Sequence, residues 1–220
     1  MYYTGVMNRT QIHEHSDEQI MDIVRQLRVA YQLKRTLRYS TTRDFNEHNE
    51  SVAEHVFGLF FLAEYFLPLE DPEKNLNIEK LHRIILFHDF GEITHGDVPY
   101  HWKTPEHQAQ EEQDARAVFA SLPAPLAALG EESWRTYEDR SSPEACFAYA
   151  LDKIEPIFEL FDPVNEKTMK RVKFTYKDHI EKKHKATENY PVLRKFIDVA
   201  SKDMLARKVL WEEEQTIDSK

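Results

Sequence analysis

The sequence is short of glycine and has a single cysteine. Five glycines among 220 residues leave few positions for tight hairpin turns or phosphate-cradling loops, so the composition favours an all-α fold. The lone Cys146 excludes an internal disulfide framework and a cysteine-based zinc site. It is compatible with a reducing compartment, and we expect a cytoplasmic protein.

The sequence also lacks an excess of positive charge and a long hydrophobic run. It has 29 Lys and Arg against 39 Asp and Glu, a net charge of −10, which excludes a general electrostatic grip on a nucleic-acid backbone. One local cationic cluster could still hold a small phosphate. The longest apolar run, over 56–66, contains Glu64 and is shorter than the ~18 residues of a membrane helix. We therefore expect neither a nucleic-acid polymer nor a membrane as partner.

Apolar residues recur at helical spacing along most of the chain. No internal repeat or linker divides the sequence, so we expect one domain over 1–220, a bundle of about six to eight helices. Residues 35–50, 97–105 and 123–130 are expected to be loops or turns, the last with at most a short helix. The predicted helices cover 17–34, 51–66, 78–93, 106–121, a segment beginning at Pro143, 165–185 and 190–213.

Two polar residues interrupt the most apolar of these helices. His88 and Asp89 lie within the run IILFHDF at 84–90, which is otherwise apolar on nearly every side. A helix of that kind is usually central in the core, where polar side chains need partners. The two residues could simply hydrogen-bond each other, or they could belong to a larger site.

Two further residues favour the larger site. His55 lies beside Val56 near the start of a predicted helix that opens with the capping box Ser51–Glu54, and Asp152 lies between apolar residues of the helix after Pro143. Taken singly, His55 fits a helix-surface residue and Asp152 a salt-bridge partner. Together with His88 and Asp89 they form a nitrogen and oxygen ligand set that suits Mn, Fe, Co, Ni, Zn or Mg.

Two carboxylates follow the His-Asp pair. Glu92 comes four residues after His88, which would place both side chains on one side of a helix. A carboxylate in that position could hold a water or move a proton. Asp97 follows Gly96, a plausible helix stop, and could bind a substrate hydroxyl, transfer a proton or merely cap a turn.

The order of these residues is similar to a known signature. His55, then His88-Asp89, then Asp152 resembles the H…HD…D pattern of the HD superfamily of metal-dependent phosphohydrolases. The segments ESVAEH (50–55) and HDFGEITHGDVP (88–99) resemble those of the bacterial 5′-deoxynucleotidases and their eukaryotic HD-domain relatives. The resemblance covers roughly residues 24–160.

The resemblance implies a single divalent metal ion, a homodimer and specific residue roles. The implied metal ligands are His55, His88, Asp89 and Asp152. Glu92 and Asp97 match the two acidic catalytic positions of the family.

The family also holds the substrate phosphate with an arginine upstream of the first histidine. Arg38 and Arg35 are the candidates here, Arg38 being preferred for its spacing to His55, with Arg43 as a third. Relatives carry a tryptophan shortly after this arginine, where the present sequence has Tyr39.

We therefore expect a hydrolase of nucleoside, especially deoxynucleoside, 5′-monophosphates that uses metal-activated water. One alternative is hydrolysis of guanosine tetraphosphate alarmones, but those relatives carry an adjacent Glu-Asp pair where this chain has Glu92 followed by Ile93. The other alternative is a catalytically silent HD domain that keeps a metal for stability.

Overall fold

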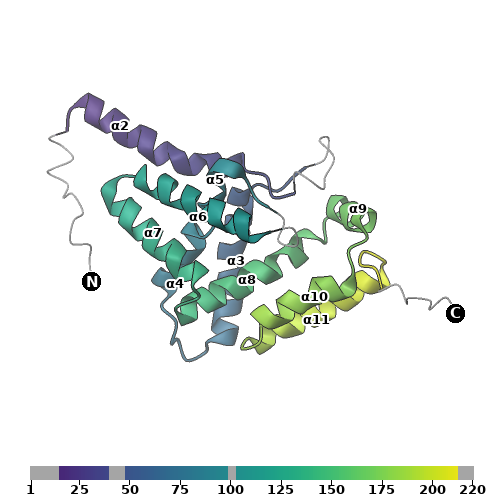
Figure 1. The fold of residues 1–220 in the computed structure, drawn as a ribbon. Helices are drawn as coiled ribbons and strands as arrows, with labels where there is room; N and C mark the ends of the chain where they lie inside the picture. Colours follow the sequence, from purple (N-terminus) through teal and green to yellow (C-terminus); the bar gives the residue numbers. More distant parts are fainter. Residues whose placement is uncertain (1–14, 40–47, 99–102, 213–220) are drawn as a thin grey trace.

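The computed structural model describes residues 15–39, 48–98 and 103–212, and these fold entirely as helices and connecting loops (Figure 1). Only two isolated β-bridges, and no sheet, occur in these ranges. The all-α prediction is confirmed. The helices are α2 (Asp17–Leu27), the 3-10 helix η1 (Arg28–Lys34), α3 (Val52–Glu70), α4 (Ile78–Phe87), α5 (Glu92–His95), α6 (Pro105–Ala120), α7 (Ala124–Glu138), α8 (Pro143–Glu159), α9 (Pro163–Val172), α10 (Tyr176–Ala186) and α11 (Pro191–Ala206).

Helix α8 occupies the middle of the bundle (Figure 1). It packs against α3, α4 and α7 on one side and against the α10–α11 pair on the other. Fully buried Phe147, Leu151 and Ile154 follow one another along α8 at helical spacing. The helix therefore carries any polar residue on its inner face, such as Asp152, into the centre of the molecule.

Helix α3 is long and apolar enough to cross a bilayer by length and composition alone. A core helix of a globular protein passes the same test, and α3 packs against α4, α8 and α11. The prediction that this helix stops before Pro68 is wrong. Pro68 removes one backbone donor from the last turn, but Phe66 is fully buried and Glu70 accepts a hydrogen bond from the backbone of Leu193, so contacts continue past the proline.

The described residues contain more α-helices than expected, because three predicted helices are broken. The 17–34 helix turns into 3-10 geometry at Arg28, and the 78–93 helix ends at Phe87. The 165–185 helix breaks at Lys173, which adopts a left-handed conformation with φ of 52°. The last predicted helix, 190–213, ends at Ala206.

The turn predicted over 123–130 is instead part of α7. Gly130 lies inside that helix, although glycine is unfavourable there. A Cβ at this position would come within 2.6 Å of the Phe119 ring. The glycine therefore permits the close approach of α6 to α7, and tertiary packing overrides the local preference.

Candidate metal centre and active site

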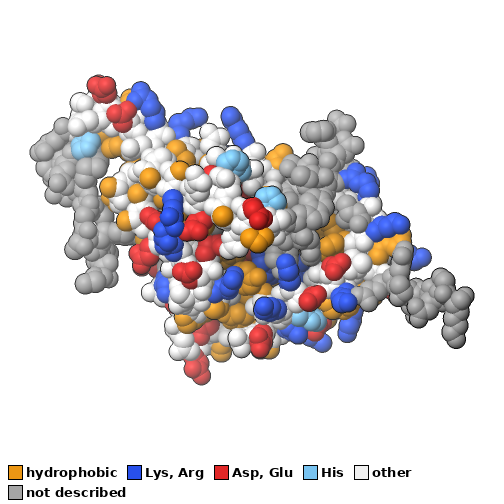
Figure 2. Space-filling view, viewed as in Figure 1, with side chains coloured by type: hydrophobic (Ala, Val, Ile, Leu, Met, Phe, Trp, Pro, Cys, Tyr) orange, Lys and Arg blue, Asp and Glu red, His pale blue; other side chains and the backbone are white. Residues whose placement is uncertain are grey.

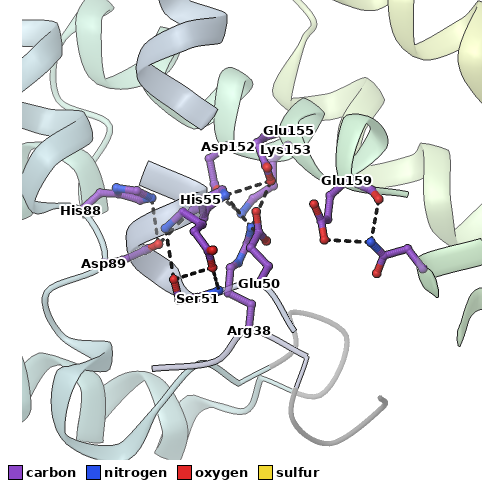
Figure 3. Close-up of polar contacts among 12 residues, drawn as sticks. Arg38, Glu50, Ser51, His55, His88, Asp89, Asp152, Lys153, Glu155 and Glu159 are labelled. Carbon is purple, nitrogen blue, oxygen red and sulfur yellow. Dashed lines mark hydrogen bonds and ion pairs between the residues drawn. The ribbon is translucent and has the colours of Figure 1, made fainter. Parts of the chain in front are cut away.

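The four residues of the H…HD…D pattern meet in the interior (Figure 3). His55 Nε2 lies 3.1 Å from Asp152 Oδ1 and 3.8 Å from Asp89 Oδ2. His88 Nε2 lies 3.1 Å from the same Asp89 oxygen. Three separate segments thus bring two imidazoles and two carboxylates to one point.

The capping box at the start of α3 positions His55, the first of the candidate ligands. Ser51 accepts a hydrogen bond from the backbone of Glu54, and the Glu54 carboxylate accepts one from the backbone of Ser51, so the predicted capping box is present. This cap fixes the start of α3 and puts His55 in its first turns, where the side chain is fully buried.

The two histidines are prepared to bind a cation through Nε2. His88 Nδ1 lies 2.8 Å from the carbonyl oxygen of Ile85, and His55 Nδ1 lies 2.8 Å from Glu155 Oε2. The Ile85 carbonyl holds the proton of His88 on Nδ1 and leaves a lone pair on Nε2. His55 Nδ1 lies between the Glu155 acceptor and the Arg38 donor, and its Nε2 faces Asp152 and Asp89. His88 Nε2 is buried and makes no hydrogen bond in the described residues, although the Asp89 carboxylate lies 3.1 Å away; a lone pair facing a carboxylate is costly unless a cation lies between them. The set fits one divalent ion.

The two carboxylates of this set are held ionised. Burial opposes ionisation of Asp89, but the neighbouring His88 outweighs it and lowers the pKa of Asp89 to about 2. Burial likewise opposes ionisation of Asp152, and Lys153 and His55 outweigh it, so the pKa of Asp152 lies well below its usual range. Anionic carboxylates are the form that binds a metal.

A second layer of charge lies beneath His55. Arg38 Nη1 donates to Glu50 Oε2 at 3.1 Å and to Glu155 Oε2 at 3.0 Å. Burial and the charge of Glu155 raise the pKa of Glu50 to about 8, whereas His55 and Arg38 overcome burial and lower that of Glu155 to about 2. Glu50, His55 and Glu155 also form a cluster of potential metal ligands, but Arg38 already contacts all three.

Glu92 and Asp97 border a cavity of about 490 Å³ that also exposes Asp89 and Asp152. Burial, together with the charges of Asp89 and Asp97, raises the pKa of Glu92 well above its usual range. Burial, only partly offset by Arg38, raises that of Asp97 to about 6. Glu92 Oε2 is buried without a hydrogen-bond partner among the described residues. Both groups therefore face the cavity as candidate proton carriers.

Glu92 and His88 do not share one regular helix, contrary to the prediction. Residues 88–91 form tight turns, in which the backbone N–H of Glu92 donates to Asp89 at 3.1 Å, and Glu92 begins the short α5. Gly96 ends α5 with φ of 85°, as the predicted helix stop requires.

The arginine candidates differ in their position relative to the cavity. Arg38 lines the cavity, whereas Arg35 is exposed and is not among the residues that line it. Arg43 lies outside the described residues.

Sequence reasoning missed three partners of the ligand set. Glu155 orients His55, and the Tyr137 hydroxyl donates to Asp152 Oδ2 at 2.8 Å. Lys153 also donates to Asp152. Glu155 follows Asp152 by three residues on α8, a spacing that could have identified it; nothing in the sequence singled out Tyr137.

The chain resembles known proteins over most of its length. The family model described as HD domain matches residues 30–194, three quarters of the chain. A 5′-deoxynucleotidase HDDC2 of Mus musculus is 31% identical over 62% of this chain and 67% of its own length. A 5′-deoxynucleotidase hdd1 of Schizosaccharomyces pombe is 29% identical over 64% of this chain and 72% of its own. The match to the bovine HDDC2 spans 63% of that relative's length.

Two solved structures resemble the fold of this chain. A protein of Magnetospirillum magnetotacticum described as a predicted metal-dependent phosphohydrolase has a TM-score of 0.70 and 26% identity, over 89% of this chain and all of its own. An HD-domain phosphohydrolase of Listeria innocua shares the fold at a TM-score of 0.57 and 20% identity, over 86% of this chain and 92% of its own. The chain belongs to the HD domain family.

Proposed function

We propose that this protein hydrolyses the phosphate monoester of nucleoside 5′-monophosphates, with deoxynucleotides as the preferred class. The observation that carries the proposal is the convergence of His55, His88, Asp89 and Asp152 beside two carboxylates with raised pKa values, in one cavity. The similarity to proteins named 5′-deoxynucleotidases supports the substrate class.

The four ligands would hold one divalent cation, for which Mn, Co, Fe, Ni, Zn and Mg are the candidates. Such a cation supplies Lewis-acid chemistry, which activates water and polarises a phosphoryl oxygen. The backbone carbonyl of Ile85 keeps the His88 imidazole in the ligating tautomer, and Glu155 and Arg38 together fix the orientation of His55.

The remaining groups divide the proton transfers. Asp97, with a pKa of about 6, is ionised at neutral pH and accepts the proton of the attacking water. Glu92, whose pKa lies well above its usual range, keeps its proton and donates it to the departing 5′ oxygen of the nucleoside. Arg38 contacts the phosphate from the cavity wall while Glu50 and Glu155 hold its other side.

A panel of substrates and metals tests the function. The purified protein is stripped with a chelator, reloaded separately with Mn, Co, Mg or Zn, and assayed with deoxynucleoside and ribonucleoside 5′-monophosphates, 3′-monophosphates and guanosine tetraphosphate. We expect phosphate release from the 5′-monophosphates with at least one metal. Pyrophosphate release from guanosine tetraphosphate would favour the alarmone hydrolase, and silence with all substrates the metal-stabilised scaffold.

Paired variants test the arginine. Arg38→Ala removes a partly buried cation that Glu50 and Glu155 share, so we expect weaker substrate binding together with a lower Tm. Arg35→Ala, at an exposed position three residues away, should leave KM and Tm unchanged. A raised KM in Arg35→Ala alone would transfer the phosphate contact to Arg35.

We also propose that the protein is a homodimer. Phe57, Phe61 and Tyr65 form an exposed stripe along α3, with exposed fractions of 72%, 70% and 55%. Such a stripe is suited to pack against its own copy across a twofold axis. Light scattering should show a dimer that Phe61→Glu dissociates and that Met21→Glu, on the exposed face of α2, does not. A monomeric parent protein would end this proposal.

Residues 1–220 are proposed to form one HD-type domain in the cytoplasm. One hydrophobic cluster extends from Leu33 to Ile197 and joins η1 to α11. Cys146 is free, which agrees with a reducing compartment. Fractionation of cells expressing the tagged chain would test the location.

A further inference from the structure

The cavity extends beyond the ligand set onto α10. Helices α8 and α10 pack together in Figure 1, and Figure 2 shows Lys and Arg side chains beside apolar atoms over this part of the surface. Asp178, His179, Lys182 and Lys183 of α10 line the same cavity as Asp89 and Asp152. A lysine from α10, far from the signature in sequence, thus faces the same space as the reacting groups.

Lys183 is unusual among the lysines of the chain. Its side chain makes no hydrogen bond or ion pair with any residue that the structure describes. Burial and the like charge of Lys153 lower the pKa of Lys183 to about 8. A partly buried ammonium group with no carboxylate in hydrogen-bond contact is poorly compensated, so its position on the cavity wall suits an anion that enters the cavity.

The charges around the cavity indicate which anion. One divalent cation balances Asp89 and Asp152, and Arg38 is already balanced by Glu155. Lys183 then remains as a cation that faces the cavity without a hydrogen-bonded carboxylate among the described residues, and a phosphate monoester at neutral pH carries nearly two negative charges.

We propose that Lys183 is a phosphate-positioning residue, which contacts the phosphoryl group of the substrate. The proposal rests on the proposed function for the identity of the substrate, but the site itself requires only a phosphate dianion. It assigns α10 a direct role in binding. It also predicts that Lys183 lowers stability in the absence of the anion, which a purely structural lysine would not do.

The test compares Lys183→Met with Lys183→Arg, and with Lys185→Met as the matched control on the same helix. Lys185 is exposed and lies outside the cavity. Each protein is loaded with one metal, and its metal content is measured. The readouts are KM and kcat for a deoxynucleoside 5′-monophosphate, the inhibition constant of inorganic phosphate, and Tm with and without inorganic phosphate.

We expect Lys183→Met to raise KM and the phosphate inhibition constant by about tenfold or more, as does loss of a hydrogen bond to a charged group. Its Tm without phosphate should equal or exceed that of the parent, whereas the phosphate-induced rise in Tm should shrink. Lys183→Arg should recover most of the affinity, and Lys185→Met should match the parent, with metal content equal in all four proteins.

Unchanged phosphate affinity in Lys183→Met would overturn the proposal, whatever its Tm. A lower Tm without phosphate, not recovered by Lys183→Arg, would make Lys183 a structural residue and also overturn it. If the parent hydrolyses no nucleotide but its phosphate-induced rise in Tm still depends on Lys183, the proposed function fails while the anion site stands.

Discussion

Two pairs of carboxylates border the same cavity and have opposite electrostatic environments. Asp89 and Asp152 lie beside His88, His55 and Lys153, and the pKa of each falls below its usual range. Glu92 and Asp97 lie on the other border, where burial and neighbouring carboxylates raise both pKa values. The same chemical group is thereby held as an anion in one place and retains its proton to higher pH in the other, which suits the proposed roles of metal ligand and proton carrier.

The comparison explains why the site needs buried cations in a protein of net charge −10. A carboxylate that must bind a metal is kept ionised by an adjacent imidazole or ammonium group. At Glu92 and Asp97, burial and neighbouring carboxylates outweigh the charge of Arg38. Position relative to a few cations, more than residue type, separates the two roles.

Removal of a ligand carboxylate should have the largest effect. Asp152→Asn keeps the shape of the side chain and an acceptor for the Tyr137 hydroxyl but removes the anion. Loss of an outer hydrogen-bond partner already weakens metal binding ~10–100-fold, so we expect the loss of a ligand to weaken it by about 100-fold or more, with activity lost in parallel. Elemental analysis after dialysis measures the metal. Asp178→Asn, on the α10 wall of the cavity, is the control and should stay loaded.

Removal of a proton carrier should affect turnover and leave the metal in place. Glu92→Gln keeps size and hydrogen bonding but cannot give up a proton, and positioned acid–base groups contribute ~10²–10⁴-fold. We expect kcat to fall by about that factor at full metal content. Glu111→Gln, which alters another carboxylate of the cavity that pairs with Lys103, should keep most of the activity. A Glu92→Gln enzyme that turns over at the parent rate would reduce Glu92 to a bystander.

The pH dependence should reveal the two carriers separately. Ionised Asp97 is needed to accept a proton, so kcat/KM should fall about tenfold per pH unit below its pKa, while loss of the Glu92 proton should lower the rate at high pH. The acidic limb should lie at or below about 6, because a bound cation favours the ionised form. In Asp97→Asn the remaining activity should lose this limb. An acidic limb that persists unchanged would assign it to another group.

The meeting of His55 with His88 and Asp89 could be predicted from the sequence, but much of what surrounds these residues could not. His88 and Asp89 are conspicuous because they interrupt an apolar run, and His55 follows a recognisable helix cap. Glu155 and Lys183 belong to charged stretches that resemble solvated helix faces. Only the packing of α8 against α10 brings Lys183 to the site, and that contact leaves no local signal.

Some features of the fold could likewise be predicted from local sequence, and others could not. The start of α8 at Pro143 and the helix stop at Gly96 follow from the conformational preferences of proline and glycine, and both were predictable. The break at Lys173 precedes a segment whose Phe174 and Tyr176 hydrogen-bond the backbone of Trp211, and Gly130 inside α7 meets Phe119, so both features involve neighbours distant in sequence. Local preference cannot anticipate them.

One carboxylate outside the site also has a lowered pKa, and its removal should have the smallest effect of the changes considered. Glu144, at the start of α8, accepts a hydrogen bond from the backbone of Asn77 at 3.1 Å and pairs with Lys80 at 3.0 Å. These partners outweigh burial and lower its pKa to about 2, and no imidazole is among its partners in the described residues. Its ionisation should therefore stabilise the contact between α4 and α8 and leave the metal and the activity unaffected.

We expect Glu144→Gln to lower the free energy of unfolding at pH 7 by about 1 kcal/mol, which lowers Tm by ~2–4 °C in a chain of this size. Because the folded-state pKa is depressed, the stabilisation is present above the unfolded pKa of about 4.3 and disappears as the pH falls toward about 2. The Tm difference from the parent should thus be constant from pH 7 to 5 and shrink below pH 4. Lys80→Met should show part of the same Tm difference. A Tm difference that does not change with pH would mean that side-chain packing, and not the charge of Glu144, stabilises the contact between α4 and α8.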